Sequence, residues 1–117
     1  MSITRLRPGP RMSQAVVHGD TVYLAGQVAD EAKGKSVGEQ TREILAAIDR
    51  LLAEAGSDKT KILSATIYLA DIATFSQMNA VWDTWVPQGH TPARATVEAK
   101  LAAAAYAVEI ACIAARG

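Results

Sequence analysis

The first third of the chain carries short apolar, β-branched runs separated by polar residues. Residues 12–17 and 21–28 have this pattern, and the intervening His18-Gly19-Asp20 is typical of a hairpin turn. Residues 30–36 are mostly charged or small and predict a loop. The chain is therefore expected to begin with two antiparallel strands.

The middle of the chain changes to the spacing of amphipathic helices. Ser36 and Glu39 form a capping-box pattern, and the helix they begin is expected to end at Gly56. Its apolar face recurs every three or four residues, at Val37, Thr41, Ile44, Leu45, Ile48, Leu51 and Leu52. A second capping box at Thr74 and Gln77 predicts another helix that ends near Pro87, with an apolar face of Ile72, Phe75, Met78, Trp82 and Trp85.

Three further strands are predicted, at 62–70, 93–101 and 106–115, with 102–105 joining the last two as a hairpin. The order of elements is strands, helix, strand, helix and two strands. This order favours an α+β fold in which a mixed sheet carries both helices on one face.

Size, charge and cysteine content restrict the function classes. A chain of 117 residues forms one domain, here residues 1–117, and its formal net charge is zero. That charge argues against nucleic-acid binding through a basic face. No apolar run is long enough to span a membrane, and the single Cys112 fits a reducing cytoplasm. High apolar content without net charge suggests that part of the surface is covered by another subunit.

The candidate chemistry lies in the last two predicted strands. Glu109 is the one ionisable residue in the apolar run 108–115, where an ionised carboxylate is costly unless it is paired or functional. Arg94, on the preceding strand, carries a planar charged fork suited to a carboxylate. If these strands form a hairpin, its register decides whether the two residues share a face. A structural ion pair and a functional site both remain open.

Other residues carry weaker signals. Gly26, inside a predicted strand, marks a bulge or a close approach of the backbone to a ligand. His18 and His90 lie in predicted loops without a second ligand at metal spacing, so no metal site is expected. Cys112 is expected to be a small buried residue. The pair Trp82 and Trp85 fits the core or an interface.

Several segments, which together cover nearly the whole domain, resemble a known family. The segment Pro92-Ala93-Arg94-Ala95-Thr96-Val97-Glu98, followed by Leu101 and Val108-Glu109-Ile110, is similar to the C-terminal signature of the Rid family. These proteins are the RidA/YjgF reactive intermediate deaminases, also labelled endoribonuclease L-PSP or translation inhibitor. The segment 22–28 resembles the strand of that family that leads into a Ser-Gly-Gln step.

The resemblance implies a chorismate-mutase-like trimer fold, with ligand clefts between the subunits of a homotrimer. It also implies hydrolysis of enamine and imine carboxylates to 2-oxo acids and ammonia, without a metal or organic cofactor. Under it, Arg94 holds the substrate carboxylate and Glu109 positions or activates water. Gly26, Thr96, Ala25 and Met12 take the positions that contact substrate.

Three of these positions depart from the family pattern and imply an altered substrate preference. Thr96 stands where cysteine is common, Ala25 replaces a serine, and Met12 replaces an aromatic residue. Two alternatives remain open beside the deaminase. One is a trimer that binds small carboxylates or 2-oxo acids without turnover. The other is a ribonuclease, which the absence of net positive charge disfavours.

Overall fold

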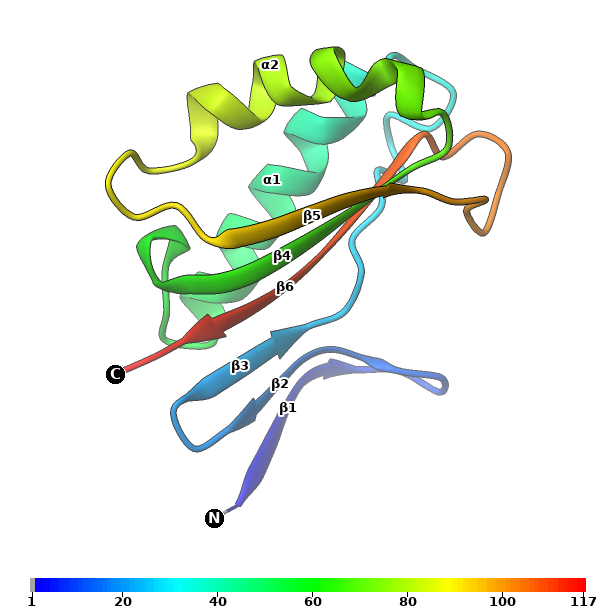
Figure 1. Cartoon of the computed structure of the whole chain (residues 1–117). Coiled ribbons are helices and arrows are strands. Elements are labelled where there is room, and N and C mark those ends of the chain that lie inside the picture. The colour runs from blue at the N-terminus through cyan, green and yellow to red at the C-terminus, as the bar shows by residue number, and fades with distance from the viewer. Residues whose placement is uncertain (1) are drawn as a thin grey trace.

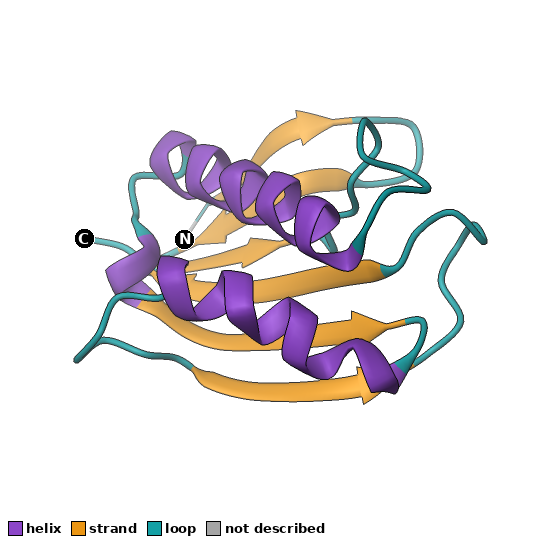
Figure 2. Cartoon of the chain, turned by 90° about the horizontal axis from the view of Figure 1, so that it is seen from above, coloured by secondary structure: helices purple, strands orange, loops and turns teal. Residues whose placement is uncertain are grey.

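The fold is a six-stranded mixed sheet with both long helices on one face (Figures 1 and 2). It was established with a computed structural model, which describes residues 2–117. The strand order is β1-β2-β3-β6-β4-β5. The elements are β1 (Ile3–Pro8), β2 (Ser13–His18), β3 (Thr21–Leu24), α1 (Val37–Glu54), β4 (Ile62–Leu69), α2 (Phe75–Trp85), β5 (Ala93–Glu98) and β6 (Val108–Ala115). The predicted α+β class is confirmed.

Two crossover connections explain why the helices share a face. Helix α1 leads from β3 to β4, and α2 leads from β4 to β5. Strands β4 and β5 pair in parallel, and β6 lies antiparallel between β3 and β4. Both crossovers therefore advance in the same direction across the sheet. Because such connections are almost always right-handed, helices that advance in one direction cover one face.

The predicted hairpin between the last two strands is wrong. Strand β4 lies between β5 and β6, so β5 occupies the edge of the sheet and β6 a central position. The burial patterns give the physical reason. Alternate residues of β6 are fully buried, as a central strand requires, whereas β5 stays largely exposed. In addition, two strands joined by a helix usually pair in parallel, and the sequence pattern already predicted a helix between β4 and β5.

The observed strand boundaries differ most from the predicted ones near the N-terminus. Strand β1 was not predicted, because its residues are mostly exposed and show no alternation of burial. It pairs with β2 across a turn in which the Gly9 amide donates to the Met12 carbonyl at 2.8 Å. The strand predicted for 21–28 ends at Leu24, beyond which Gln27 forms an isolated bridge with Ile110.

The helix ends test the two capping predictions. At α1 the predicted cap is confirmed, because the Ser36 hydroxyl accepts from the Glu39 amide at 3.2 Å; the Glu39 carboxylate accepts from the same hydroxyl at 3.1 Å rather than from the Ser36 amide. At α2 it is wrong, because Thr74 makes no side-chain capping bond. A short 3-10 turn precedes α2 instead, and Asp71 caps that turn by accepting from the Ala73 amide.

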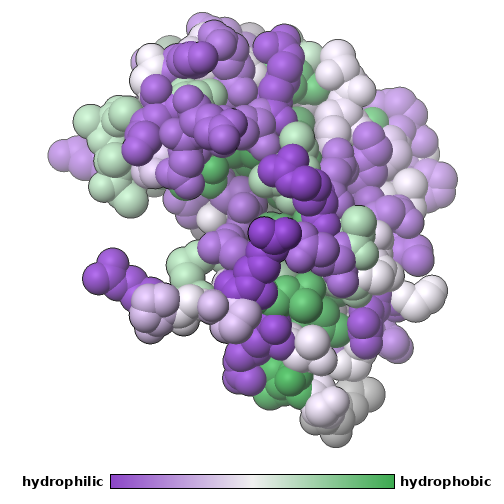
Figure 3. All heavy atoms as spheres, turned by 180° about the vertical axis from the view of Figure 1, so that it is seen from behind, coloured by the Kyte–Doolittle hydropathy of each residue, from purple (hydrophilic) through white to green (hydrophobic). Residues whose placement is uncertain are grey.

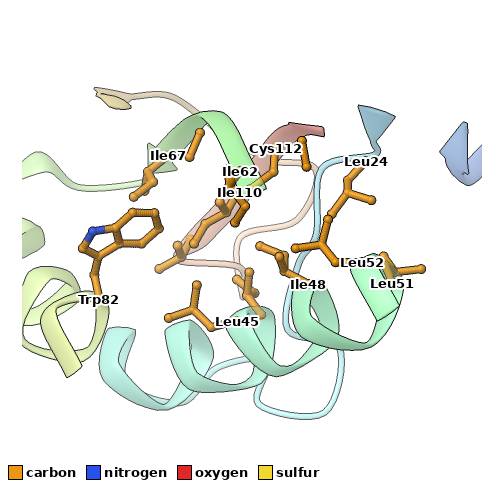
Figure 4. Packing of buried hydrophobic residues seen from close by; sticks show 14 of the residues in the cluster. Leu24, Leu45, Ile48, Leu51, Leu52, Ile62, Ile67, Trp82, Ile110 and Cys112 are labelled. Carbon is orange, nitrogen blue, oxygen red and sulfur yellow. The ribbon is translucent and has the colours of Figure 1, made fainter. Parts of the chain in front are cut away.

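The core lies between the helices and the sheet (Figure 4). Ile48 and Leu52 of α1 pack toward Ile110 of β6, and all three side chains have no exposed surface. Trp82 of α2 covers the part of the sheet near β4. The other face of the sheet is the open face, which carries the exposed apolar residues Tyr23, Val97 and Ile113. Within residues 2–117, no helix combines the length and apolar character needed to cross a membrane.

A bidentate ion pair ties β1 to α1. The Nε and Nη2 atoms of Arg7 donate to the two carboxylate oxygens of Glu54 at 3.0 and 2.8 Å. The hydrogen bond from Arg7 lowers the pKa of Glu54 below its ordinary value of 4.5, and the same contact raises the pKa of Arg7. Both side chains are well exposed, so solvent screens the pair.

This pair predicts a pH-dependent contribution to stability. Because the pKa of Glu54 is lower in the folded chain, the contribution is present above the ordinary carboxyl pKa of 4.5 and lost as the pH falls through the folded value. Urea unfolding of the wild type and Glu54→Gln should therefore differ modestly at neutral pH and converge in acid. A difference of equal size at both ends of that range would contradict the assignment.

Candidate functional site

Glu109 and Gly26 meet where β3 ends beside β6. A Cβ atom added to Gly26 would lie 2.2 Å from Glu109 Oε2 and 2.9 Å from its Cδ. Only the missing side chain of glycine leaves room for the carboxylate there. The Gln27 amide donates to the Ile110 carbonyl at 2.8 Å, which holds the backbone in this position. The group that approaches Gly26 closely is thus a side chain of the protein, and the approach of a ligand to this glycine stays a prediction.

Glu109 lies on the open face of the sheet. Its strand neighbours Val108 and Ile110 are buried beneath the helices, so alternation turns Glu109 the other way. It is half-buried and stands directly opposite Tyr68 of β4. The sequence of β6 is apolar on both faces of the strand, but the helices cover only one of them. The Glu109 carboxylate is on the uncovered face, so it is less desolvated than the apolar run suggested.

Ala25 and Met12 lie near the same end of the sheet. The Ala25 amide donates to the Gln14 carbonyl at 2.9 Å, which continues the β2–β3 pairing beyond the end of β3. Met12 directly precedes β2 and is 49% exposed. Neither side chain offers a polar group. We call the predicted site residues at this end of the sheet, Glu109, Gly26, Ala25 and Met12, the glutamate half-site; of these, Gly26 is the one shown close to the Glu109 carboxylate.

Arg94 is held between α2 and the edge strand β5. Its Nη1 atom donates to the Asn79 side-chain oxygen at 2.8 Å. The guanidinium carbon lies 5.2 Å from the centre of the Trp82 ring and 5.7 Å from that of the Phe75 ring. One amide and two aromatic rings thus fix its direction, while its other donors keep the capacity to bind an anion. We call this group the arginine half-site.

Thr96 follows Arg94 on the same face of β5. Its hydroxyl oxygen is buried and has no hydrogen-bond partner among the described residues. Burying a hydroxyl without a partner costs about 1–3 kcal/mol, so the arrangement is unfavourable in the isolated chain. Glu98, the next residue on this face, accepts from the Ile72 amide at 3.0 Å and joins β5 to the 3-10 turn that precedes α2.

The two half-sites lie on opposite faces of the sheet. Arg94 stands opposite Ala65 of β4 and shares the helix-covered face. Glu109 stands opposite Tyr68, three residues further along β4, and an odd separation along a strand means opposite faces. An ion pair between Arg94 and Glu109 within one chain is therefore excluded. The sequence-predicted site residues divide into Arg94 with Thr96, and Glu109 with Gly26, Ala25 and Met12.

Sequence reasoning did not identify Asn79 and Phe75 as partners of Arg94. Both belong to α2: Phe75 was predicted only as part of its apolar face, and Asn79 lies between Met78 and Trp82. The signal was a polar residue three positions before Trp82, on a face otherwise expected to be apolar. Trp82 itself is 5% exposed, as a core residue should be, and its ring still contacts Arg94.

Two other candidates can be placed. Cys112 is buried, as predicted, and burial raises the pKa of its thiol to about 12, which makes it unreactive at neutral pH. Within residues 2–117, no group of three or more His, Cys, Asp or Glu side chains is arranged to hold a metal ion.

Solved structures with this architecture are known. A member of the YjgF protein family from Neisseria meningitidis has a TM-score of 0.96 and 45% identity, and the comparison covers 100% of this chain and 97% of that one. The fold thus defines a small α+β protein of the YjgF type.

Sequence comparison leads to the same family. Residues 2–116 match the family described as Endoribonuclease L-PSP. A RutC family protein from Haemophilus influenzae is 46% identical over 97% of this chain and 98% of its own length. A rat 2-iminobutanoate/2-iminopropanoate deaminase is 34% identical over 90% of this chain and 80% of its own length. The chain belongs to the Rid family, also known as the YjgF or endoribonuclease L-PSP family, which confirms the resemblance.

Proposed function

We propose that the protein hydrolyses small imine or enamine carboxylates to 2-oxo acids and ammonia. One observation carries this proposal. The chain holds an arginine in a fixed direction in one half-site and an accessible carboxylate in the other. The rat relative named as a 2-iminobutanoate/2-iminopropanoate deaminase supports the reaction class.

The arginine half-site would bind the substrate carboxylate. Asn79 and the Phe75 and Trp82 rings hold the guanidinium in one direction, so less side-chain entropy is lost on binding. A bidentate contact would then fix the adjacent imine carbon, which supplies most of the positioning that hydrolysis needs.

The glutamate half-site would activate water. The Glu109 carboxylate takes a proton from water while the water oxygen bonds to the imine carbon. The same proton is returned to nitrogen, which gives a carbinolamine. A second transfer through Glu109 then moves the proton of the new hydroxyl group to nitrogen, so that the carbon–nitrogen bond breaks and ammonia leaves as the carbonyl forms. An enamine must first be protonated at carbon to give the imine, and protonated Glu109 can donate that proton.

The site would form between two subunits of a homotrimer. Because Arg94 and Glu109 lie on opposite faces of one chain, a substrate that touches both must bind between chains. The open face carries exposed Tyr23, Val97 and Ile113, which favour coverage by another copy.

The pocket would prefer apolar substrate side chains. Met12 and Ala25 offer no polar side-chain group on the glutamate side. Small alkyl imino acids fit these surroundings better than hydroxylated ones, because a buried hydroxyl would lack a partner. Substrate preference thus differs from that of family members with serine and an aromatic residue at these positions.

The test is to generate 2-iminopropanoate in situ and to follow its decay by absorbance. Wild-type protein should accelerate the decay over buffer, and Arg94→Ala should remove most of the acceleration. Calorimetric titration with 2-oxobutanoate runs in parallel. Saturable binding without acceleration would replace the deaminase with a non-catalytic binding trimer, and the absence of both would reject the proposal.

A further inference from the structure

A polar hollow lies on the helix side of the sheet, between α1 and the N-terminal strands. Its volume is about 180 Å³, and its polar lining consists of Arg7, Gln14, Gln27, Arg50 and Glu54. Seen from behind, the molecule is hollowed between the helical layer and the projecting β1–β2 turn (Figure 3). None of these residues belongs to the arginine or the glutamate half-site.

Arg7 adopts a strained backbone conformation at the mouth of this hollow. Its φ is 50°, and among residues 2–117 it is the one non-glycine residue with a positive φ. Such a conformation is energetically unfavourable for a residue other than glycine, and it concentrates at functional sites. The register runs from Leu6 opposite Ala15 to Pro8 opposite Ser13 and omits Arg7. Arg7 instead bonds Glu54 of α1, so the strain places a guanidinium beside the hollow.

Hydrogen-bond donors are in excess around the hollow. The Gln27 side-chain nitrogen donates to Gln14 Oε1 and to the Ala25 carbonyl, both at 3.0 Å, which uses its two hydrogens. The Gln14 side-chain nitrogen is left to donate elsewhere. Arg50 is exposed and makes no hydrogen bond to the described residues, but its charge contributes to the lowered pKa of Glu54. Two arginines against one glutamate leave a net positive charge.

We propose that this hollow binds a small anion of the carboxylate or phosphate class. Arg50 would supply the main charge, the free edge of Arg7 and the Gln14 amide would donate hydrogen bonds, and Leu51 forms part of the floor. A space of about 180 Å³ holds several water molecules, which is room for phosphate or a carboxylic acid of a few carbons.

The proposed anion site adjoins the backbone of the glutamate half-site. Gln27 lines the hollow, and its neighbour Gly26 contacts the Glu109 carboxylate on the open face. An anion that orders the Gln14 and Gln27 amides would therefore stiffen the segment on which Glu109 rests. The anion site does not depend on the proposed deaminase activity.

The test is a nuclear magnetic resonance titration of the full-length protein with inorganic phosphate and, separately, with succinate. Sodium chloride holds the ionic strength constant. Saturable shifts are expected in the side-chain amide signals of Gln14 and Gln27. Arg50→Gln should weaken binding about tenfold or more, as expected for a lost charged hydrogen bond. Gln14→Met should weaken it without any change in charge.

Two controls locate the site. Arg42→Gln removes the same charge from an exposed position on α1 and should leave the affinity unchanged, as should Arg94→Ala. Binding of phosphate alone or of both anions supports the proposal and identifies the class of ligand. It is overturned by unsaturable shifts, by equal weakening in Arg42→Gln and Arg50→Gln, or by loss of binding in Arg94→Ala.

Discussion

Replacing Glu109 by glutamine is expected to lower kcat for imine hydrolysis about 10²–10⁴-fold, the usual contribution of a general acid–base group. Glutamine keeps the shape of the side chain beside Gly26 but cannot accept a proton from water. Because Arg94 and its Asn79 contact are unchanged, KM should move little. Steady-state kinetics with 2-iminopropanoate generated in situ measure both constants.

The matched control for this result is Glu31→Gln, which removes one carboxylate from an exposed loop position. It should retain wild-type kcat. A Glu109→Gln variant that keeps kcat within about threefold of the wild type would be far outside the general acid–base range. Glu109 would then have no role in proton transfer, and the glutamate half-site would lose its chemistry.

Adding one methyl group at Gly26 is expected to reduce turnover almost as strongly. In Gly26→Ala the new Cβ would lie 2.2 Å from Glu109 Oε2 and 3.2 Å from its Cγ, so the carboxylate must move. A displacement of about 1 Å in a reacting group can cost about 10²-fold in rate. The half-buried side chain can swing toward the open face, so the chain should still fold, which circular dichroism checks.

Gly38→Ala is the control for Gly26→Ala. An added Cβ there meets its nearest neighbour, Val81, at an ordinary 3.7 Å, so activity should be unchanged. If Gly26 acts through Glu109, the double variant Gly26→Ala/Glu109→Gln should be no slower than Glu109→Gln alone. Additive losses would mean that Gly26 has a role independent of Glu109.

The elements of the fold could be predicted largely from periodicity, but their pairing could not. The apolar spacing from Val37 to Leu52 defined α1, and the Ser36 cap fixed its start. The predicted hairpin of β5 and β6 was wrong because it paired strands that are adjacent in sequence. The crossover through α2 instead pairs β5 in parallel with β4. Strand β1 escaped detection because Ile3 and Arg5 are exposed, so no buried face marks the segment.

For the candidate site, too, local features could be predicted from the sequence, whereas contacts between distant elements could not. Alternation placed Glu109 and Arg94 on definite faces of their own strands, and the lack of a side chain at Gly26 indicated a close approach. Whether Arg94 and Glu109 share a face of the sheet depends on β4, which lies between β5 and β6. No local sequence pattern predicts that position of β4. Asn79 was missed because its partner Arg94 lies on another element.

The central claim is that each active site takes Arg94 from one chain and Glu109 from another. Mixing unfolded Arg94→Ala and Glu109→Gln chains in equal amounts and refolding them together tests it most directly. Sites with Arg94 from one variant and Glu109 from the other are intact, so about a quarter of wild-type activity should return, although each variant alone is inactive. A mixture no more active than the separate variants would contradict the shared site.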